Sequence, residues 1–427
     1  MPHHMGEHKV RCAVGGELLE RRSFGCKLHN SLARAEYPRE LVVRSLPGLW
    51  KFLDWLPVNE ELSEVSPGSI CFRSDTFARN LGLKNLWISF SGYWPERKGA
   101  CPTCTFKDLE AAPTIRRLTD LGEGGSALVV ASAGNTGKAF AHVASLTGRP
   151  VVLIVPVSCF DKLWIPRDDP DHGGLFVVGV KGDYADAIDL ADRLSKEPGF
   201  VPEGGARNIA RRDGMGTVML EAAVTMKALP QHYFQAVGSG AGGIAAWEAS
   251  QRLIEDGRFG SSMPSLRLAQ NLPCAPILSR FNGTKMNEDC PQDMYDLVLY
   301  NRRPPYEVGG GVRDALEATH GTVIGVTNDE ALSARINFQA DEGIDIVPAA
   351  AVAAAALMKQ VIDDKIDRRD RVLLNITGGG EARLYHDVGT RRIPCHTRVD
   401  AASVDVKSVA SWALEFLGKR GEMEGGK

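Results

Sequence analysis

From about residue 126 onward, the chain alternates short apolar runs with amphipathic stretches that have the period of a helix. The apolar residues of these runs occupy successive positions instead of every second position. Examples are the runs 126–131, 150–157, 175–180 and 372–376. A strand of this kind is buried on both faces, so helices must cover both sides of its sheet. The alternation therefore predicts an α/β fold of mostly parallel sheets flanked by helices.

The composition limits the classes of partner. The 427 residues are 44% hydrophobic and 24% charged, with a net charge of -3, which gives no electrostatic attraction to nucleic acid or to an anionic membrane. No apolar run approaches the roughly 20 residues that span a bilayer, and the first residues lack the pattern of a signal peptide. Nine scattered cysteines indicate reduced thiols. We expect a cytoplasmic protein with small-molecule partners.

Three glycine-rich loops follow predicted strands, where backbone amides and a helix N-terminus bind anions. The first, at 132–138, is not a nucleoside-triphosphate loop, because Ser132 and Ala139 stand where that motif needs Gly and Ser or Thr. The second, at 238–243, satisfies GxGxxG. The strand after it ends in Gln270 and Asn271 instead of the acid that binds a ribose, so a phosphate monoester fits better than a dinucleotide. A plain tight turn remains the alternative.

The third loop, 377–380, places Thr377 and three glycines at the end of a strand, which lets another group approach the backbone closely. Upstream of all three loops stands Lys107, in the segment Thr-Phe-Lys-Asp. A lone lysine is nearly always a solvated surface charge. Here it precedes a Ser-Ala-Gly-Asn loop, a glycine-rich loop and a Thr-Gly-Gly-Gly end, in that order.

This ordered set resembles the fold-type-II pyridoxal-phosphate enzymes, which include threonine synthase, threonine dehydratase and cysteine synthase. The resemblance implies two lobes, each with a mostly parallel sheet flanked by helices, and a pyridoxal 5'-phosphate cofactor held as a Schiff base on the catalytic Lys107. It assigns the phenolic oxygen of the cofactor to Asn135 and the pyridine nitrogen to Thr377. The phosphate is assigned to Gly238, Ser239, Gly240, Ala241 and Gly242. The substrate carboxylate is assigned to Ser132, Asn135 and Thr136 at a helix N-terminus.

The implied chemistry is elimination or replacement. A freed Lys107 amine takes the α-proton of the substrate, and the cofactor accepts the resulting negative charge. A neutral hydroxyl such as that of Thr377 does not hold the pyridine nitrogen protonated. The resemblance therefore implies rapid loss of a β or γ leaving group instead of transamination.

Longer stretches resemble the cysteate synthases, threonine-synthase relatives of methanogen coenzyme M biosynthesis. Among them are the segments 200–208, 211–217 and 270–276, and the resemblance runs from about residue 26 to residue 390. It implies that O-phospho-L-serine loses phosphate to give a bound aminoacrylate, to which sulfite adds to form L-cysteate. Two anionic ligands require fixed positive charge and amide donors. The candidates are Arg207, Asn208, Arg211, Arg212 and Lys138.

The sequence also departs from the family. Leu109 and Glu110 stand where threonine synthases carry an Arg, which argues against plain threonine synthase. Many relatives have an N-terminal zinc-ribbon-like cluster of four cysteines. Here Gly15 replaces the partner of Cys12, and Cys26 with His29 makes half a site. Two cysteines and one histidine fall one ligand short of a closed tetrahedral site, so the sequence predicts a degenerate ribbon and no metal.

These inferences predict a division into parts. We expect a degenerate ribbon (1–35), a large cofactor-binding domain (36–125 and 231–415), a small mobile domain (126–230) and a flexible tail (416–427). The fold group implies a homo-oligomer. Two alternatives to cysteate formation stay open: the same chemistry with another nucleophile or phospho-amino-acid, as in threonine synthase or a phosphoserine sulfhydrylase, and a non-catalytic phospho-ligand-binding protein on the same scaffold.

Overall fold

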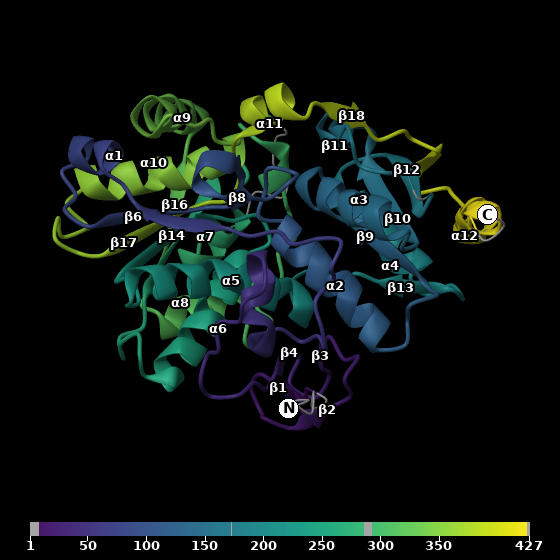
Figure 1. Cartoon of the computed structure of the whole chain (residues 1–427), viewed down its shortest axis with the longest axis horizontal. Helices are drawn as coiled ribbons and strands as arrows, with labels where there is room; N and C mark the ends of the chain where they lie inside the picture. The colour runs from purple at the N-terminus through teal and green to yellow at the C-terminus, as the bar shows by residue number, and fades with distance from the viewer. Residues whose placement is uncertain (1–7, 172, 286–292, 425–427) are drawn as a thin grey trace.

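The computed structural model describes residues 8–171, 173–285 and 293–424. Two α/β lobes lie side by side, and a small N-terminal sheet lies beneath them (Figure 1). The fold is therefore the expected α/β arrangement of mostly parallel sheets between helices.

The larger sheet has six strands in the order β16-β15-β14-β17-β6-β5. All pairs are parallel except the edge pair of β5 and β6. Helices α1, α9 and α10 cover one face, while α5, α6 and α8 cover the other (Figure 1). The strands are β5 (Ile70–Arg73), β6 (Leu86–Phe90), β14 (His232–Ala236), β15 (Ser265–Asn271), β16 (Thr322–Val326) and β17 (Val372–Ile376). The helices are α1 (Thr76–Asn80), α5 (Ile209–Met226), α6 (Ala241–Asp256), α8 (Val312–Ala318), α9 (Asn328–Glu342) and α10 (Pro348–Ile362).

The second sheet has five parallel strands in the order β13-β9-β10-β12-β19. Helix α3 packs on one face, while α4 and α12 pack on the other. Asp183 begins α4 with a capping box, because its carboxylate accepts from the amides of Ala185 and Asp186. The strands are β9 (Ala127–Ala131), β10 (Val151–Pro156), β12 (Leu175–Lys181), β13 (Phe200–Pro202) and β19 (Thr397–Asp400). The helices are α3 (Asn135–Thr147), α4 (Tyr184–Leu194) and α12 (Val406–Glu424).

The C-terminal segment differs from the expected division of the chain. Strand β19 pairs in parallel with β12, so the chain returns to the second sheet instead of staying with the first. Helix α12 extends through most of the predicted flexible tail, and Phe416 lies against Phe176 and His396. Residues 425–427 of that tail lie outside the described residues. The return of β19 depends on pairing between distant residues, which local patterns do not reveal.

Helix α2 (Asp108–Asp120) joins the two lobes, because it packs against α3 on one side and α5 on the other. Helix α5 also packs closely on α6. The shorter elements are η1 (Gly48–Trp55), the hairpin β7 (Tyr93–Trp94) and β8 (Gly99–Ala100), the pair β11 (Trp164–Pro166) and β18 (Thr390–Arg392), α7 (Pro276–Phe281) and α11 (Glu381–Asp387).

The N-terminal sheet is antiparallel, in the order β2-β1-β4-β3. Its small core of Val10 and Ala33 packs on Ile209 at the start of α5. The amide of Leu32 donates to the carbonyl of Gly309 at 2.8 Å. Its strands are β1 (Val10–Cys12), β2 (Leu18–Leu19), β3 (Gly25–Cys26) and β4 (Ser31–Ala35).

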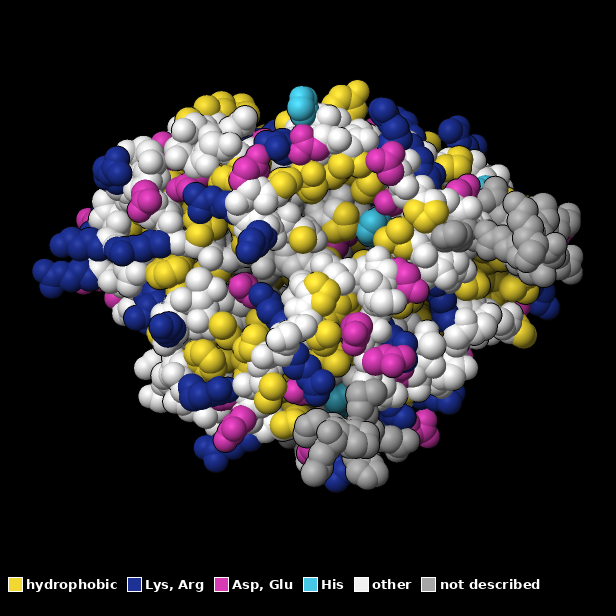
Figure 2. Space-filling model, in the orientation of Figure 1, with side chains coloured by type: hydrophobic (Ala, Val, Ile, Leu, Met, Phe, Trp, Pro, Cys, Tyr) yellow, Lys and Arg dark blue, Asp and Glu magenta, His cyan; other side chains and the backbone are white. Residues whose placement is uncertain are grey.

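The surface agrees with the near-neutral composition. On the face shown in Figure 2, basic and acidic side chains alternate across the described part of the surface without forming a continuous basic stripe. Among the described residues, no helix has the length and apolar character required to cross a bilayer. The eight described cysteines carry free thiols, as their number and spacing predict.

Candidate active site

The lysine segment and the late glycine loop lie against each other. The amide of Phe106 donates to the carbonyl of Thr377 at 2.9 Å, and Thr105 forms a β-bridge with Gly378. Lys107 then occupies the position before the first turn of α2. Two motifs from distant parts of the sequence are thus joined by backbone hydrogen bonds.

One pocket between the lobes collects most of the predicted site residues. It holds about 720 Å³ of space that no protein atom fills. The predicted residues that line it are Lys107, Ser132, Asn135, Thr136, Arg211, Gly238, Ser239, Gly240, Ala241, Gly242 and Thr377. Tyr184, Gln235 and Asn301 also line it, and the sequence analysis did not identify these three. All of the elements predicted to hold a cofactor therefore face the same space.

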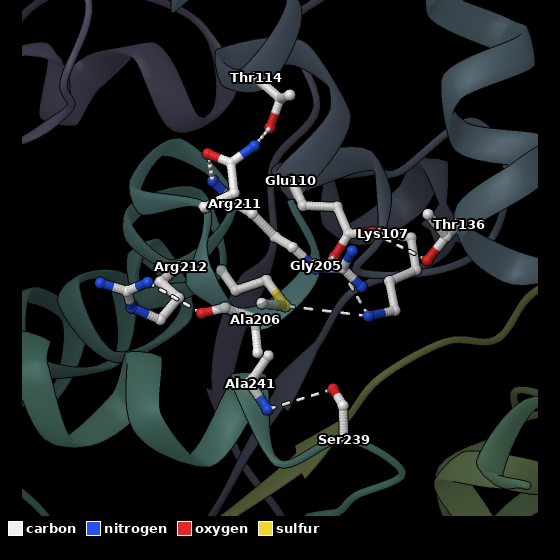
Figure 3. Close-up of polar contacts among 12 residues, drawn as sticks. Lys107, Glu110, Thr114, Thr136, Gly205, Ala206, Arg211, Arg212, Ser239 and Ala241 are labelled. Carbon is white, nitrogen blue, oxygen red and sulfur yellow. Dashed lines mark hydrogen bonds and ion pairs between the residues drawn. The ribbon is translucent and has the colours of Figure 1, made fainter. Parts of the chain in front are cut away.

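The second glycine loop connects β14 to α6 and forms one wall of the pocket. Gly240 has a left-handed φ of +86°, and a Cβ there would lie 2.2 Å from Cγ2 of Val312. The amide of Ala241 donates to Oγ of Ser239 at 3.5 Å (Figure 3). The helical hydrogen bonds begin with the amide of Ile244 and the carbonyl of Gly240, so the amides before it have no acceptor within the helix. Such a helix N-terminus binds a phosphate.

A second helix N-terminus, that of α3, opens on the same pocket. The hydroxyl of Ser132 accepts from the amides of Gly134 at 3.0 Å and Gly137 at 2.7 Å, which holds the loop. Asn135 and Thr136 form the first turn of the helix that follows. The hydroxyl of Thr136 donates to Oε1 of Glu110 at 2.9 Å. The backbone amides of this turn are suited to a carboxylate.

Glu110 is the central residue that the sequence analysis did not assign to the site. Its side chain is completely buried, and its Oε2 lies 3.1 Å from Nζ of Lys107 and 2.9 Å from Nε of Arg211 (Figure 3). Arg211 also reaches Oε2 of Glu203 at 2.8 Å. Glu110 lies three residues after Lys107 on one helix, and this spacing puts both side chains on the same face. That spacing is the signal that identifies it.

Burial sets the protonation of these groups. Desolvation lowers the pKa of Lys107 below its ordinary value of 10.5, although the Glu110 carboxylate opposes that shift, and the Arg211 guanidinium reinforces it. For Arg211, burial lowers the pKa, but Glu110 and Glu203 together raise it above its usual range. Burial raises the pKa of Tyr184 to about 12. The arginine thus stays charged, while the lysine is brought closer to its neutral form.

Four of the predicted anion-binding residues do not line the pocket. Arg207 reaches Oδ1 of Asn30 in the N-terminal sheet, at 3.4 Å. Asn208 caps α5, accepting from the amide of Ala210 at 3.0 Å, and donates to the carbonyl of Glu203. The structure does not bring these two predicted substrate ligands into the pocket, because both side chains have structural partners outside it.

Arg212 and Lys138 also have partners outside the pocket. Arg212 is fully buried and binds Glu248 and the carbonyl of Ala206. Lys138 pairs with Glu381 at 2.9 Å and lies over the ring of Trp164. Both are therefore structural ion-pair residues, and Arg211 is the one predicted arginine that reaches the pocket.

Comparison with known proteins yields a consistent set of relatives. The model of the family "Pyridoxal-phosphate dependent enzyme" matches residues 72–378. A cysteate synthase from Methanococcoides burtonii is 51% identical over 413 residues, which cover 96% of this chain and 97% of that protein. A cysteate synthase from Methanothrix thermoacetophila is 52% identical over 402 residues, which cover 92% of this chain and 96% of that protein.

Solved structures resemble the fold at much lower identity. A pyridoxal 5'-phosphate-dependent aspartate racemase superposes with a TM-score of 0.57 at 17% identity, covering 73% of this chain and 90% of the racemase. Threonine deaminase isoform 2 from Solanum lycopersicum superposes with a TM-score of 0.55 at 16% identity, covering 83% of this chain and 97% of the deaminase. At these identities the likeness extends to the fold alone.

Proposed function

Because the chain belongs to the pyridoxal-phosphate dependent enzymes and, within them, to the cysteate synthase family, we propose that it converts O-phospho-L-serine and sulfite into L-cysteate and phosphate. The observation that carries the proposal is the single pocket that joins Lys107, the glycine loop before α6 and Thr377. In this β-replacement the C–O bond to phosphate breaks, and a C–S bond to sulfite forms at the same carbon.

The residues around the pocket fit pyridoxal phosphate. The loop 238–242 fits the phosphate, since it lines the pocket and the amides that open α6 have no acceptor within the helix. Lys107 fits the aldehyde carbon, because burial favours its nucleophilic, neutral amine. The hydroxyl of Thr377, a residue that is 5% exposed, fits the pyridine nitrogen, and Asn135 fits the phenolic oxygen. When bound, the cofactor supplies an electron-accepting ring conjugated to the substrate's amino group.

Lys107 has two tasks in this reaction. Its Nζ would hold the cofactor in the resting enzyme, and its free, neutral amine would take the proton from Cα of the substrate. Glu110, 3.1 Å away, stabilises the protonated lysine after that transfer, and its carboxylate is itself held by the Thr136 hydroxyl and the Arg211 guanidinium. Glu110 therefore adjusts the basicity of the amine, and Arg211 limits that effect by binding the same carboxylate.

The N-terminus of α3 binds the substrate carboxylate, and the N-terminus of α6 binds the phosphate of the cofactor. The backbone amides of the α3 turn, including that of Thr136, and the side-chain amide of Asn135 bind the substrate carboxylate and so orient the Cα–H bond toward Lys107. The departing phosphate and the entering sulfite share the remaining space, which Tyr184 and Asn301 also line. Both polar side chains can donate hydrogen bonds to oxyanions.

Two measurements test the proposal. Purified enzyme should show the visible absorbance of a lysine-bound cofactor, and Lys107→Ala should lose it together with at least about 10²–10⁴-fold in turnover. Incubation with phosphoserine and either sulfite or sulfide, followed by product analysis, tests the nucleophile. Cysteate formed in preference to cysteine supports the proposal. Preferential cysteine formation, or retained absorbance and turnover in Lys107→Ala, would contradict it.

We propose further that the enzyme works in the cytoplasm as a homo-oligomer. The free thiols support a reducing compartment. Leu332 and Ile336, 46% and 60% exposed, lie one turn apart on α9 and form the candidate contact. Light scattering on the wild type and on Ile336→Lys tests the assembly. A monomeric wild type would rule it out.

A further inference from the structure

We propose that the N-terminal sheet holds a structural zinc ion through Cys12, Glu17, Cys26 and His29. One ligand atom from each of these residues lies within 4.8 Å of every other. The set unites two thiols, an imidazole and a carboxylate, which is a donor set that Zn²⁺ binds in a closed tetrahedral site. We call these four residues the N-terminal cluster. It is separate from the pocket and independent of the reaction proposed for that pocket.

The distances within the cluster match those expected around zinc. With Zn–S bonds of about 2.3 Å and Zn–N and Zn–O bonds of about 2.0–2.1 Å, a tetrahedron has S···N edges of about 3.5 Å and an N···O edge of about 3.3 Å. Nδ1 of His29 lies 3.4 Å from Sγ of Cys12 and 3.6 Å from Sγ of Cys26. It lies 3.4 Å from Oε2 of Glu17. Three edges of the tetrahedron are therefore present in the protein alone.

The fourth ligand is Glu17, which a count of cysteines and histidines does not include. The absence of a side chain at Gly15 leaves room for it. A Cβ at Gly15 would lie 2.3 Å from Oε1 of Glu17 and 2.4 Å from Cε1 of His29. The carboxylate of Glu17 thus fills the space that a side chain at position 15 would occupy. The predicted absence of metal rests on two cysteines and one histidine, and the turn that brings Glu17 back toward Cys12 adds the missing donor.

The backbone around the cluster is organised by two facing turns. Cys12 ends β1, and Glu17 follows in the turn before β2; Cys26 ends β3, and His29 lies in the turn before β4. The amide of Gly15 donates to Sγ of Cys12 at 3.2 Å. Amide donation of this kind stabilises a thiolate and orients it toward a metal. The two thiols are buried, at 3% and 7% exposure, so an uncompensated charge there would be costly without a cation.

A bound ion would hold together a sheet whose apolar core is small. The core consists of Val10, Ala33 and Ile209, with Leu19 and Ala35 partly buried beside it. The sheet in turn supports α5, because Nη2 of Arg212 donates to the carbonyl of Ala33 and Ile209 packs on the sheet. Helix α5 carries Arg211 into the pocket. The ion would therefore be structural and would steady the helix that forms one side of the active site.

The first experiment measures metal in the purified, cofactor-loaded enzyme. After dialysis against a weak chelator, the wild type should retain close to one zinc per chain, and it should lose this zinc to a strong chelator with a fall in thermal stability. Glu17→Gln should weaken zinc affinity about tenfold or more, since it removes one anionic ligand. Glu20→Gln, an exposed carboxylate on the same segment, is the matched control and should behave as the wild type.

The second experiment uses Co²⁺ in place of zinc, because tetrahedral Co²⁺ has intense ligand-field bands at wavelengths that the cofactor does not absorb. Gly15→Cys combined with Glu17→Ala, which empties the space that the Glu17 carboxylate occupies, should restore binding by supplying a third thiolate, and its bands should shift as sulfur replaces oxygen. Retained cofactor absorbance confirms folding in every variant. The proposal is overturned if the wild type retains no metal, if Co²⁺ gives octahedral bands, or if Glu17→Gln binds zinc as tightly as Glu20→Gln.

Discussion

Replacing Glu110 by glutamine tests how the site sets the basicity of its lysine. The substitution keeps the size of the side chain and an oxygen that can accept from Thr136, but it removes the charge 3.1 Å from Nζ of Lys107. At an effective dielectric constant near 20, a pair at this distance interacts by about 5 kcal/mol before desolvation is subtracted. Measured shifts for an opposite charge this close are about one to three pKa units, or about 1.4–4 kcal/mol.

The sign of the effect follows from the existing shift. Burial already lowers the pKa of Lys107, and Glu110 partly opposes that shift. In Glu110→Gln the pKa should fall by about one to three further units, because the opposing charge is lost while Arg211 remains. The unfolded chain keeps the ordinary value of 10.5, so it binds more protons than the folded apoenzyme between the lowered pKa and 10.5. Stability of the apoenzyme should therefore rise with pH in that window, and the window should widen in the variant.

The assay measures the rate at which the apoenzyme forms a Schiff base between Lys107 and added pyridoxal phosphate, by visible absorbance, at a series of pH values. Since only the neutral amine attacks, the rate rises with pH, and the midpoint of that rise gives the apparent pKa of Lys107. We expect this midpoint to lie about one to three pH units lower in Glu110→Gln than in the wild type. Glu221→Gln is the control, because Glu221 pairs with Lys51 away from the pocket. An unchanged midpoint, or one at higher pH, would refute the claim that the Glu110 charge raises the pKa of Lys107.

Three further predictions follow from contacts around the site. Gly240→Ala should weaken cofactor affinity about tenfold or more, measured by fluorescence titration, because alanine costs about 1–2 kcal/mol at a φ of +86° and collides with Val312; unchanged affinity would remove this loop from the phosphate site. Asp183→Ala should lower the free energy of unfolding by about 0.5–2 kcal/mol in urea denaturation, since it removes the capping box of α4; an equal loss in Asp192→Ala would argue against the cap. Arg207→Ala should change kcat/KM for phosphoserine by no more than about twofold, because its side chain lies outside the pocket; a large rise in KM would restore it as a substrate ligand.

Most of the fold was predictable because it follows from neighbouring residues. The continuously apolar runs became parallel strands, and each glycine loop lies at the carboxyl end of a strand, where parallel sheets place their ligand sites. The cap at Asp183 depends only on the three residues after it. Features of this kind need no knowledge of distant contacts. The order of the motifs along the chain then identified the family, which the comparisons confirm.

The sequence did not predict the position of side chains that depends on which face of a helix they occupy or on partners far away in the chain. Arg207, Asn208 and Arg211 are neighbours in sequence, but only Arg211 lies on the turn of α5 that faces the pocket. Asn208 has its side chain occupied by the cap of that helix. Glu110 is the reverse case, since an acidic residue in the first turn of a helix is ordinarily explained by the helix dipole. Its burial against Arg211 appears only when α2 and α5 are packed together.

The charges of the pocket show why helix N-termini must bind its anions. Among the described residues that line it, the cations are Lys107 and Arg211, and both bind Glu110. Arg211 is further neutralised by Glu203. The positive potential available to a carboxylate and a phosphate therefore comes from the amides that open α3 and α6. Amides do not titrate, so we infer that anion binding at these turns is insensitive to pH, whereas proton transfer follows the Lys107–Glu110 pair. The pKa of Lys107 in this pocket can thus change without a change in the affinity for the substrate carboxylate.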